Sequence, residues 1–317
     1  MTDRARHLLR AALMAAFLGG ALWVLAYQWV RLEPAVILAG LRTIPPGHLA
    51  AAVLAAVLGH LAITGYDAVA ARAAGISLPY RKVAAAAFIG SSFGMNAGYP
   101  LLTGTPFRVR VYALWGLGPG DVLRVVAGSA FAYWTGSLAM AGGVMALLPP
   151  GGIAGRLGVN PRMAGIVLLA CWLFFLALPI VRRRPLSLGR WTLSAPSPRQ
   201  TLAALGVSAM DWGLAAATLF FLLPPGSGLD YPAVLAVYLP AALGVWLLQI
   251  PAGLGVLDTA VLLLLPPGTV EAPVLGGLLL FRGVYYLLPL LVAAAIFFAL
   301  EGRGHLRRRR RFLRSPR

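Results

Sequence analysis

Residues 83–116 read VAAAAFIGSSFGMNAGYPLLTGTPFRVRVYALWG, an apolar stretch with an interruption near its middle. Two short apolar parts flank a break rich in Gly, Ser, Thr and Pro, and neither part has the roughly 20 residues needed to cross a hydrocarbon core. Residues 232–265 repeat the plan, with the break at IPAGLG. The first half of this second segment, 232–250, is long enough to span, so it either spans fully or re-enters. The sequence predicts two broken segments inside a membrane.

The rest of the chain is equally apolar. Hydrophobic residues make up 60% of the 317 residues and charged residues only 11%, whereas a soluble domain carries roughly 25% charged residues. We therefore expect an all-α polytopic membrane protein with about six spanning helices plus the two broken or re-entrant segments. Residues 1–300 would form one transmembrane domain and 301–317 a basic tail. The spans are predicted at about 11–30, 49–70, 121–148, 163–181, 201–223 and 272–300.

Basic residues are distributed unevenly between the two sides of these spans. The N-terminus, residues 71–82, residues 182–199 and the C-terminal tail together carry 19 of the 27. Because Lys and Arg accumulate in cytoplasmic loops, both termini are predicted to lie in the cytosol. The same distribution accounts for the net charge of +18 without nucleic-acid binding, since no aromatic platform is interleaved with the arginines. Only four basic residues fall outside, Arg31, Arg42, Arg156 and Arg162.

This topology makes the two broken segments open to opposite sides. Residues 49–148 and 201–300 each read as helix, broken segment and helix, and they are candidate inverted repeats. Inverted repeats with interrupted helices near the bilayer midplane are typical of secondary transporters. The alternative is a scaffold with irregular loops.

The first break is predicted to hold an anion. Thr105 and Pro106 are interpreted as the N-cap and first residue of a helix that starts inside the membrane. Arg108 would then lie in its first turn, and a helix N-terminus with an arginine suits a phosphate or another anionic headgroup. Tyr112 shares the face of Arg108, whereas Arg110 points away. The alternative is that both arginines snorkel to the cytosolic interface.

Acidic residues are expected to pair with a second deep arginine. Asp258 falls in the first turn after the second break, and Gly253 and Gly255 allow close backbone approach. Asp211 and Arg282 both fall about ten residues into their helices, where a charge is usually paired or functional. We expect Arg282 to pair with Asp211 or Asp258, either as a structural pair or as part of a substrate or proton path.

Other polar and aromatic residues are assigned simpler roles. Asp67 is expected near the cytosolic end of its helix, where Arg72 would satisfy it, and His60 is expected to pack or hydrogen-bond. The Trp and Tyr residues near helix ends fit interfacial belts.

The sequence gives no sign of catalysis. Ser91 and Ser92 lack a partnered base, and no metalloprotease or paired-carboxylate pattern occurs. The single cysteine, Cys171, excludes a disulfide within the chain, and no metal site or cofactor is expected. We do not expect an enzyme.

At these same residues the chain resembles the transmembrane flippase domain of the lysylphosphatidylglycerol synthase (multiple peptide resistance factor) superfamily. GYDAVAAR around Asp67 is similar to the first motif of that domain, and IPAGLGVLD and FRGVYYLLPL are similar to two later blocks. In these blocks Ala252 replaces a usual glycine, and Asp258 replaces a usual glutamate. The most specific motif, G-x5-G-x3-R-x-R-x-Y, matches at Gly98, Gly104, Arg108, Arg110 and Tyr112.

The resemblance implies lipid translocation without lysyl transfer, because no aminoacyl-transferase domain follows the last helix. The substrate would be an anionic or aminoacylated phospholipid, or a related polyprenyl or hopanoid lipid, in a bacterial inner membrane. Membrane lipids are the expected partners, with either a lipid-modifying enzyme or a second copy of the chain. Two alternatives stay open: a small-solute or ion transporter on the same scaffold, and a non-transporting accessory of a lipid-modifying enzyme. Predicted substrate-contacting residues are Arg108, Arg110, Tyr112, Gly98, Gly104, Gly253, Gly255, Asp258, Arg282, Tyr286, Asp211 and Asp67.

Overall fold

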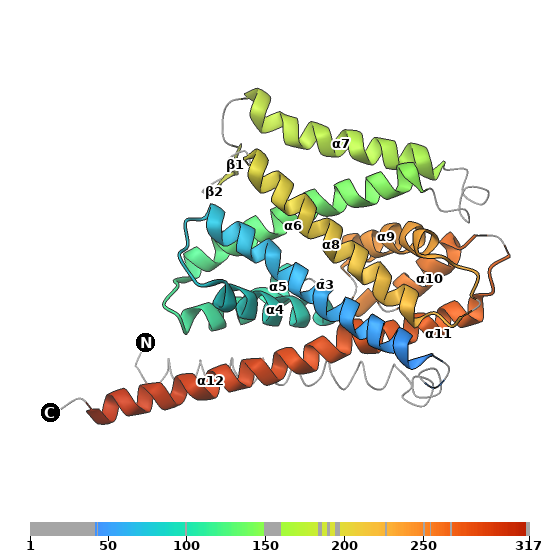
Figure 1. Cartoon of the computed structure of the whole chain (residues 1–317). Helices are drawn as coiled ribbons and strands as arrows, with labels where there is room; N and C mark the ends of the chain where they lie inside the picture. Colours follow the sequence, from blue (N-terminus) through green and yellow to red (C-terminus); the bar gives the residue numbers. More distant parts are fainter. Residues whose placement is uncertain are drawn as a thin grey trace.

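The structure is a computed structural model in which long helices run in alternating directions (Figure 1). It describes residues 42, 44–98, 100–148, 160–182, 186–188, 191–193, 197–225, 227–249, 251–253, 255–266 and 268–314. The span predicted at 11–30 lies outside the described residues. Apart from one pair of three-residue strands, every described element is helical.

Three long helices form the centre of the bundle. Helix α3 (Pro46–Ala73) and helix α8 (Pro198–Leu222) lie side by side, and α6 (Pro119–Leu147) packs against both (Figure 1). A Cβ added at Gly65 of α3 would come within 2.8 Å of Val207, and one at Gly136 of α6 would come within 2.3 Å of Ser208. Small residues thus let these backbones approach closely, as is typical of helix packing in lipid.

Helix α7 (Pro161–Arg182) lies at the edge of the bundle and packs on α6 (Figure 1). The short strands β1 (Leu186–Leu188) and β2 (Trp191–Leu193), which the sequence did not predict, pair antiparallel between α7 and α8.

The first broken segment is a pair of helices, α4 (Tyr80–Ala97) and α5 (Pro100–Ala113). Helix α4 ends at Gly98, whose φ of 73° and ψ of 165° lie in a region that is essentially confined to glycine. Helix α5 therefore restarts at Pro100, not at the predicted Thr105, and Pro106 lies inside it. Proline suits the first helical position, and in α5 that position is taken by Pro100 and not by Pro106.

The second broken segment consists of α9 (Tyr231–Leu248), a 3-10 turn η1 (Pro251–Gly253) and α10 (Val256–Leu264). Its break has positive φ values at Gln249, Ala252, Gly253 and Gly255. Helix α10 has nine residues and is too short to span. Helix α9 by itself is apolar and long enough to cross a membrane.

The last span is one continuous helical rod. Helix α11 (Glu271–Phe281) passes through a π-helical segment, η2 (Arg282–Leu287), into α12 (Leu288–Arg314). Helix α12 projects beyond the bundle (Figure 1) and remains helical through residues 301–314, which the sequence assigned to a separate tail.

Five described helical stretches are long and apolar enough to cross a membrane. Four of them match the predicted spans at 49–70, 121–148, 201–223 and 272–300, and the fifth is α9. For the span predicted at 163–181, the apolar part of α7 that the structure describes is the shorter stretch Pro161–Phe174. Large apolar side chains such as Leu61, Met210 and Phe298 are more than half exposed on the outside of the bundle, which suits a lipid-facing surface. The chain is an all-α polytopic membrane protein.

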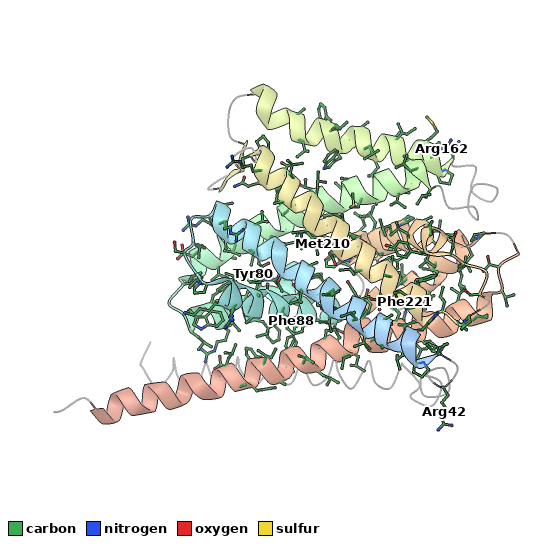
Figure 2. All side chains as sticks on the ribbon, in the orientation of Figure 1. Arg42, Tyr80, Phe88, Arg162, Met210 and Phe221 are labelled. Atoms are coloured by element: carbon green, nitrogen blue, oxygen red, sulfur yellow. The ribbon has the colours of Figure 1, made fainter. Side chains whose placement is uncertain are left out.

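The structure also bears on the sidedness of the loops. Arg42 and Arg162, both assigned to the outside, are exposed and lie on the same side of the bundle (Figure 2). The cytosolic location of the termini stays a prediction.

Candidate functional site

The tips of the two broken segments touch each other. A Cβ added at Gly98, the tip of the first, would lie 2.9 Å from the carbonyl oxygen of Gln249 and 2.9 Å from Cγ of Pro251, at the tip of the second. The two breaks, separated by about 150 residues of chain, thus meet inside the bundle. Irregular backbone at membrane depth is tolerated where it is buried in protein or lines a cavity.

A cavity of about 100 Å³ lies beside this meeting point. It is bordered by both broken segments together with α3, α6, α8 and η2. Its walls combine two charged side chains, Arg108 and Asp211, with many aromatic rings. The aromatic residues that line it are Tyr66, Tyr133, Tyr238, Tyr285, Tyr286, Trp134, Trp212 and Trp246.

Arg108 reaches the cavity from α5 and is held by a buried carboxylate. Its Nε donates to Oδ2 of Asp67 at 2.9 Å, and its terminal nitrogen donates to Oδ1 of Asp67 at 3.3 Å and to Oγ of Ser91 at 2.9 Å. Ser129 of α6 donates to the same carboxylate at 2.6 Å. Asp67 is fully buried in α3. This cluster therefore ties together α3, α4, α5 and α6.

The Arg108 cluster corrects two sequence predictions. Asp67 is not an interfacial residue satisfied by Arg72, because it points into the bundle while Arg72 is exposed. Arg108 is not in the first turn of a helix, because α5 begins eight residues earlier at Pro100, so the N-terminus of α5 lies away from it. Snorkelling is also wrong for Arg108, which is 8% exposed.

Glycines create the space that Arg108 occupies. A Cβ at Gly90 of α4 would lie 2.6 Å from Cγ of Arg108, and a Cβ at Gly104 of α5 would lie 2.3 Å from the carbonyl oxygen of Gly90. Gly104 thus sets the close approach of α4 and α5 and does not line the cavity.

Asp211 of α8 lies on the cavity wall without a cation beside it. Tyr66 donates to its Oδ2 at 3.1 Å and Tyr285 donates to its Oδ1 at 3.4 Å. Asp211 is 5% exposed, and among the described residues it forms no ion pair. The predicted alternative of pairing with Arg282 is therefore wrong for Asp211.

Arg282 pairs with Asp258, one of the two partners that the sequence predicted. The guanidinium of Arg282, in the π segment, donates to Asp258 in the first turn of α10 and to the carbonyl oxygen of Gly253 at 3.4 Å. Asn96 of α4 donates to the carbonyl oxygen of Tyr286 at 3.1 Å. The π segment thus links the last span to both broken segments.

Arg110 and Tyr112 lie away from the cavity. Arg110 donates through two nitrogens to both carboxylate oxygens of Glu301 at 2.7 Å, which joins α5 to α12. Tyr112 is fully buried in a separate apolar cluster with Phe107 and Leu290. Gly255 caps α10 and likewise does not line the cavity. His60 packs on Tyr285 with ring centroids 4.9 Å apart and hydrogen-bonds to the carbonyl oxygen of Ala56, as expected.

Apart from Tyr286, which is a predicted site residue, the aromatic wall is what sequence reasoning missed. Tyr133 and Trp212 lie near the middle of α6 and α8, so the interfacial role predicted for Trp and Tyr residues near helix ends does not apply to them. Their mid-helix position was the available signal. Among the described residues, no three His, Cys, Asp or Glu side chains are grouped so as to hold a metal ion.

Comparison with known proteins places the chain in a family of membrane proteins. No protein-family model matches the chain. It is 29% identical over 264 residues to inner membrane protein YbhN of Escherichia coli strain K12, covering 81% of each chain. It is 31% identical over 279 residues to uncharacterized protein slr0712 of Synechocystis sp. (strain ATCC 27184 / PCC 6803 / Kazusa), covering 86% of each chain. With that identity and coverage, the chain belongs to the family of polytopic membrane proteins that includes slr0712.

Proposed function

We propose that the chain is a flippase-like transporter that moves a lipid between the two leaflets of the membrane. The observation that carries the proposal is the cavity, with Arg108 and Asp211 on its walls, beside the contact between the two broken segments. Charged side chains inside a membrane bundle are costly and typically mark a substrate or ion path. The cargo would be an anionic or aminoacylated phospholipid, or a related polyprenyl or hopanoid lipid.

The geometry supports transport in a second way. Many secondary transporters place their substrate between discontinuous helices, and one part of the protein rocks against the other around that site. Here the discontinuities at Gly98 and at 249–255 meet beside the cavity. In this proposal the two broken segments move relative to each other, and the headgroup phosphate contacts Arg108.

YbhN is by name an inner membrane protein, and we propose the same location for this chain, with both termini in the cytosol. The resemblance to the flippase domain of the lysylphosphatidylglycerol synthase superfamily suggests lipid movement, and we propose no enzymatic activity.

Lipid translocation in proteoliposomes tests the proposal. The proteoliposomes contain headgroup-labelled phosphatidylglycerol and either wild type, Arg108→Ala or Arg282→Ala. A membrane-impermeant quencher added outside then reports how fast labelled lipid of the inner leaflet becomes exposed. Arg124→Ala is the matched control, because Arg124 is exposed and its ion-pair partner among the described residues is Asp121 in its own helix turn. We expect wild type and Arg124→Ala to exceed empty vesicles and Arg108→Ala to match them while eluting as folded protein. Wild type equal to empty vesicles for anionic and aminoacylated lipids would overturn the proposal.

One observation favours a second candidate, a small-solute transporter. The cavity of about 100 Å³ has room for a small polar group but not for acyl chains. A lipid carrier accommodates this by keeping the chains in the bilayer, whereas a solute carrier encloses its whole cargo. Flux of a labelled amine or amino acid with no lipid movement would favour the solute carrier.

A further inference from the structure

The cavity has an unbalanced charge. Among the described lining residues the arginine is Arg108, and it is already neutralised by Asp67. The other charged lining residue, Asp211, has only two tyrosine hydroxyls as partners among the described residues. An ionised carboxylate offers about four acceptor positions, and these two hydrogen bonds leave the others open. The charge and the open acceptor positions of Asp211 suit a cationic donor.

The rings around Asp211 form a continuous wall. Tyr133 lies 5.5 Å from Tyr66, 6.1 Å from Trp212 and 4.6 Å from Trp246, measured between ring centroids. The wall continues from Trp212 to Tyr238 at 6.4 Å. Tyr285, which donates to the carboxylate, lies 5.7 Å from Tyr286. Faces of Trp and Tyr rings attract cations, and aromatic enclosures of this kind recognise ammonium groups.

An anion fits this place poorly. A phosphate beside Asp211 would bring two negative charges together in a site of low dielectric constant. A neutral sugar would leave the carboxylate unpaired in the membrane interior, which is costly. An ammonium group satisfies both the carboxylate and the rings.

We infer that the Asp211 end of the cavity binds a primary or quaternary ammonium group. That the ammonium belongs to a lipid rests on the proposed function. In that case it is the ammonium of an ethanolamine or aminoacyl headgroup. The same chemistry would also take a free amine. With its ammonium at Asp211 and its phosphate toward Arg108, a headgroup would lie across the cavity between the two charged residues.

Ligand-induced thermal stabilisation in a neutral maltoside detergent tests the inference. The probes are dihexanoyl-phosphatidylethanolamine, dihexanoyl-phosphatidylglycerol and free ethanolamine, each titrated against the full chain. The variants are Asp211→Asn, which removes the charge at constant size, and Tyr133→Leu, which removes a ring without touching the carboxylate. Asp121→Asn is the control, because Asp121 lies in an exposed pair outside the cavity.

We expect the ethanolamine lipid to stabilise wild type and Asp121→Asn at a concentration about tenfold or more below that of the glycerol lipid. Asp211→Asn should abolish this preference and Tyr133→Leu should weaken it, which keeps the test valid if one variant does not fold. Stabilisation by free ethanolamine alone, lost in Asp211→Asn, would support the ammonium site with a solute as its source and count against the lipid. Equal effects of both lipids, or an amine effect unchanged by Asp211→Asn, would overturn the inference. Phosphatidylglycerol flipping without amine preference would leave the proposed function standing.

Discussion

Gly98 and Gln249 are in direct backbone contact: a Cβ on Gly98 would lie 2.9 Å from the Gln249 carbonyl oxygen. This contact joins the tips of two segments that are remote in sequence, and it leaves no room for a side chain. Position 98 is therefore restricted twice, by its neighbour and by its backbone angles.

Gly98→Ala should destabilise the protein more than a glycine replacement elsewhere. The backbone conformation at 98 costs about 1–3 kcal/mol for a residue with a Cβ, and forcing a methyl group against the other tip adds about 1–3 kcal/mol. Gly116→Ala is the matched control, because Gly116 also has a positive φ of 90° but has nothing within 4 Å of its Cβ position. The free energy of unfolding, measured in mixed micelles, should fall further in Gly98→Ala than in Gly116→Ala. The difference should equal the cost of the forced methyl group, about 1–3 kcal/mol. Equal losses would mean that the tips do not touch.

The Asp67–Arg108 pair should show strong coupling in a double-mutant cycle. Removing either partner leaves a buried unpaired charge, which costs about 3–5 kcal/mol, whereas removing both leaves none. We expect Asp67→Ala/Arg108→Ala to be clearly more stable than the sum of the single losses predicts. The exposed pair Asp121–Arg124 should give coupling of about 0.5 kcal/mol. Additive losses at Asp67 and Arg108 would show that the pair is not formed.

Ala252→Gly should be close to neutral. Ala252 has a φ of 46° and is 2% exposed. Glycine would relieve about 1–2 kcal/mol of left-handed strain but would lose about 0.8 kcal/mol of methyl burial and about 0.5–1 kcal/mol through the entropy of the unfolded chain. Ala242→Gly, in the helical part of α9 and 4% exposed, should lose about 2 kcal/mol. A similar loss at both positions would contradict the positive φ at 252.

Single cysteines test the predicted orientation. In a Cys171→Ser background, Arg42→Cys and Arg162→Cys should react with an impermeant maleimide added to intact spheroplasts. Arg199→Cys, exposed at the opposite end of the bundle at the start of α8, should react only after permeabilisation. The reverse pattern would invert the orientation.

Much of the fold followed from the sequence, because span length and apolar runs are local properties. The breaks at Gly98 and at 249–255 also carry local signals, since glycine and proline restrict the backbone where they stand. The start of α5 was misplaced because both Pro100 and Pro106 offer the same signal. The π segment at 282–287 carries no sequence signature that distinguishes it from an α-helix.

The partners in the site were harder to predict, since they depend on which helix faces lie together. For Arg282 the sequence left Asp211 and Asp258 as alternatives, and only the packed helices select Asp258. Asp67 was assigned to Arg72, five residues away, when its partner is Arg108 on another helix. That Asp211 forms no ion pair among the described residues is visible only once every neighbouring helix is in place.

The π segment has a further consequence for how this family varies. A π turn has the same effect as one residue inserted into an α-helix. The residues that share one face of the rod are therefore offset by one position between α11 and α12. Loss of a single codon near Gly283, where a Cβ would meet nothing within 4 Å, would regularise the rod and turn α12 by about 100° relative to α11. Homologous sequences aligned without a gap across 282–287 would then place non-equivalent residues against α5.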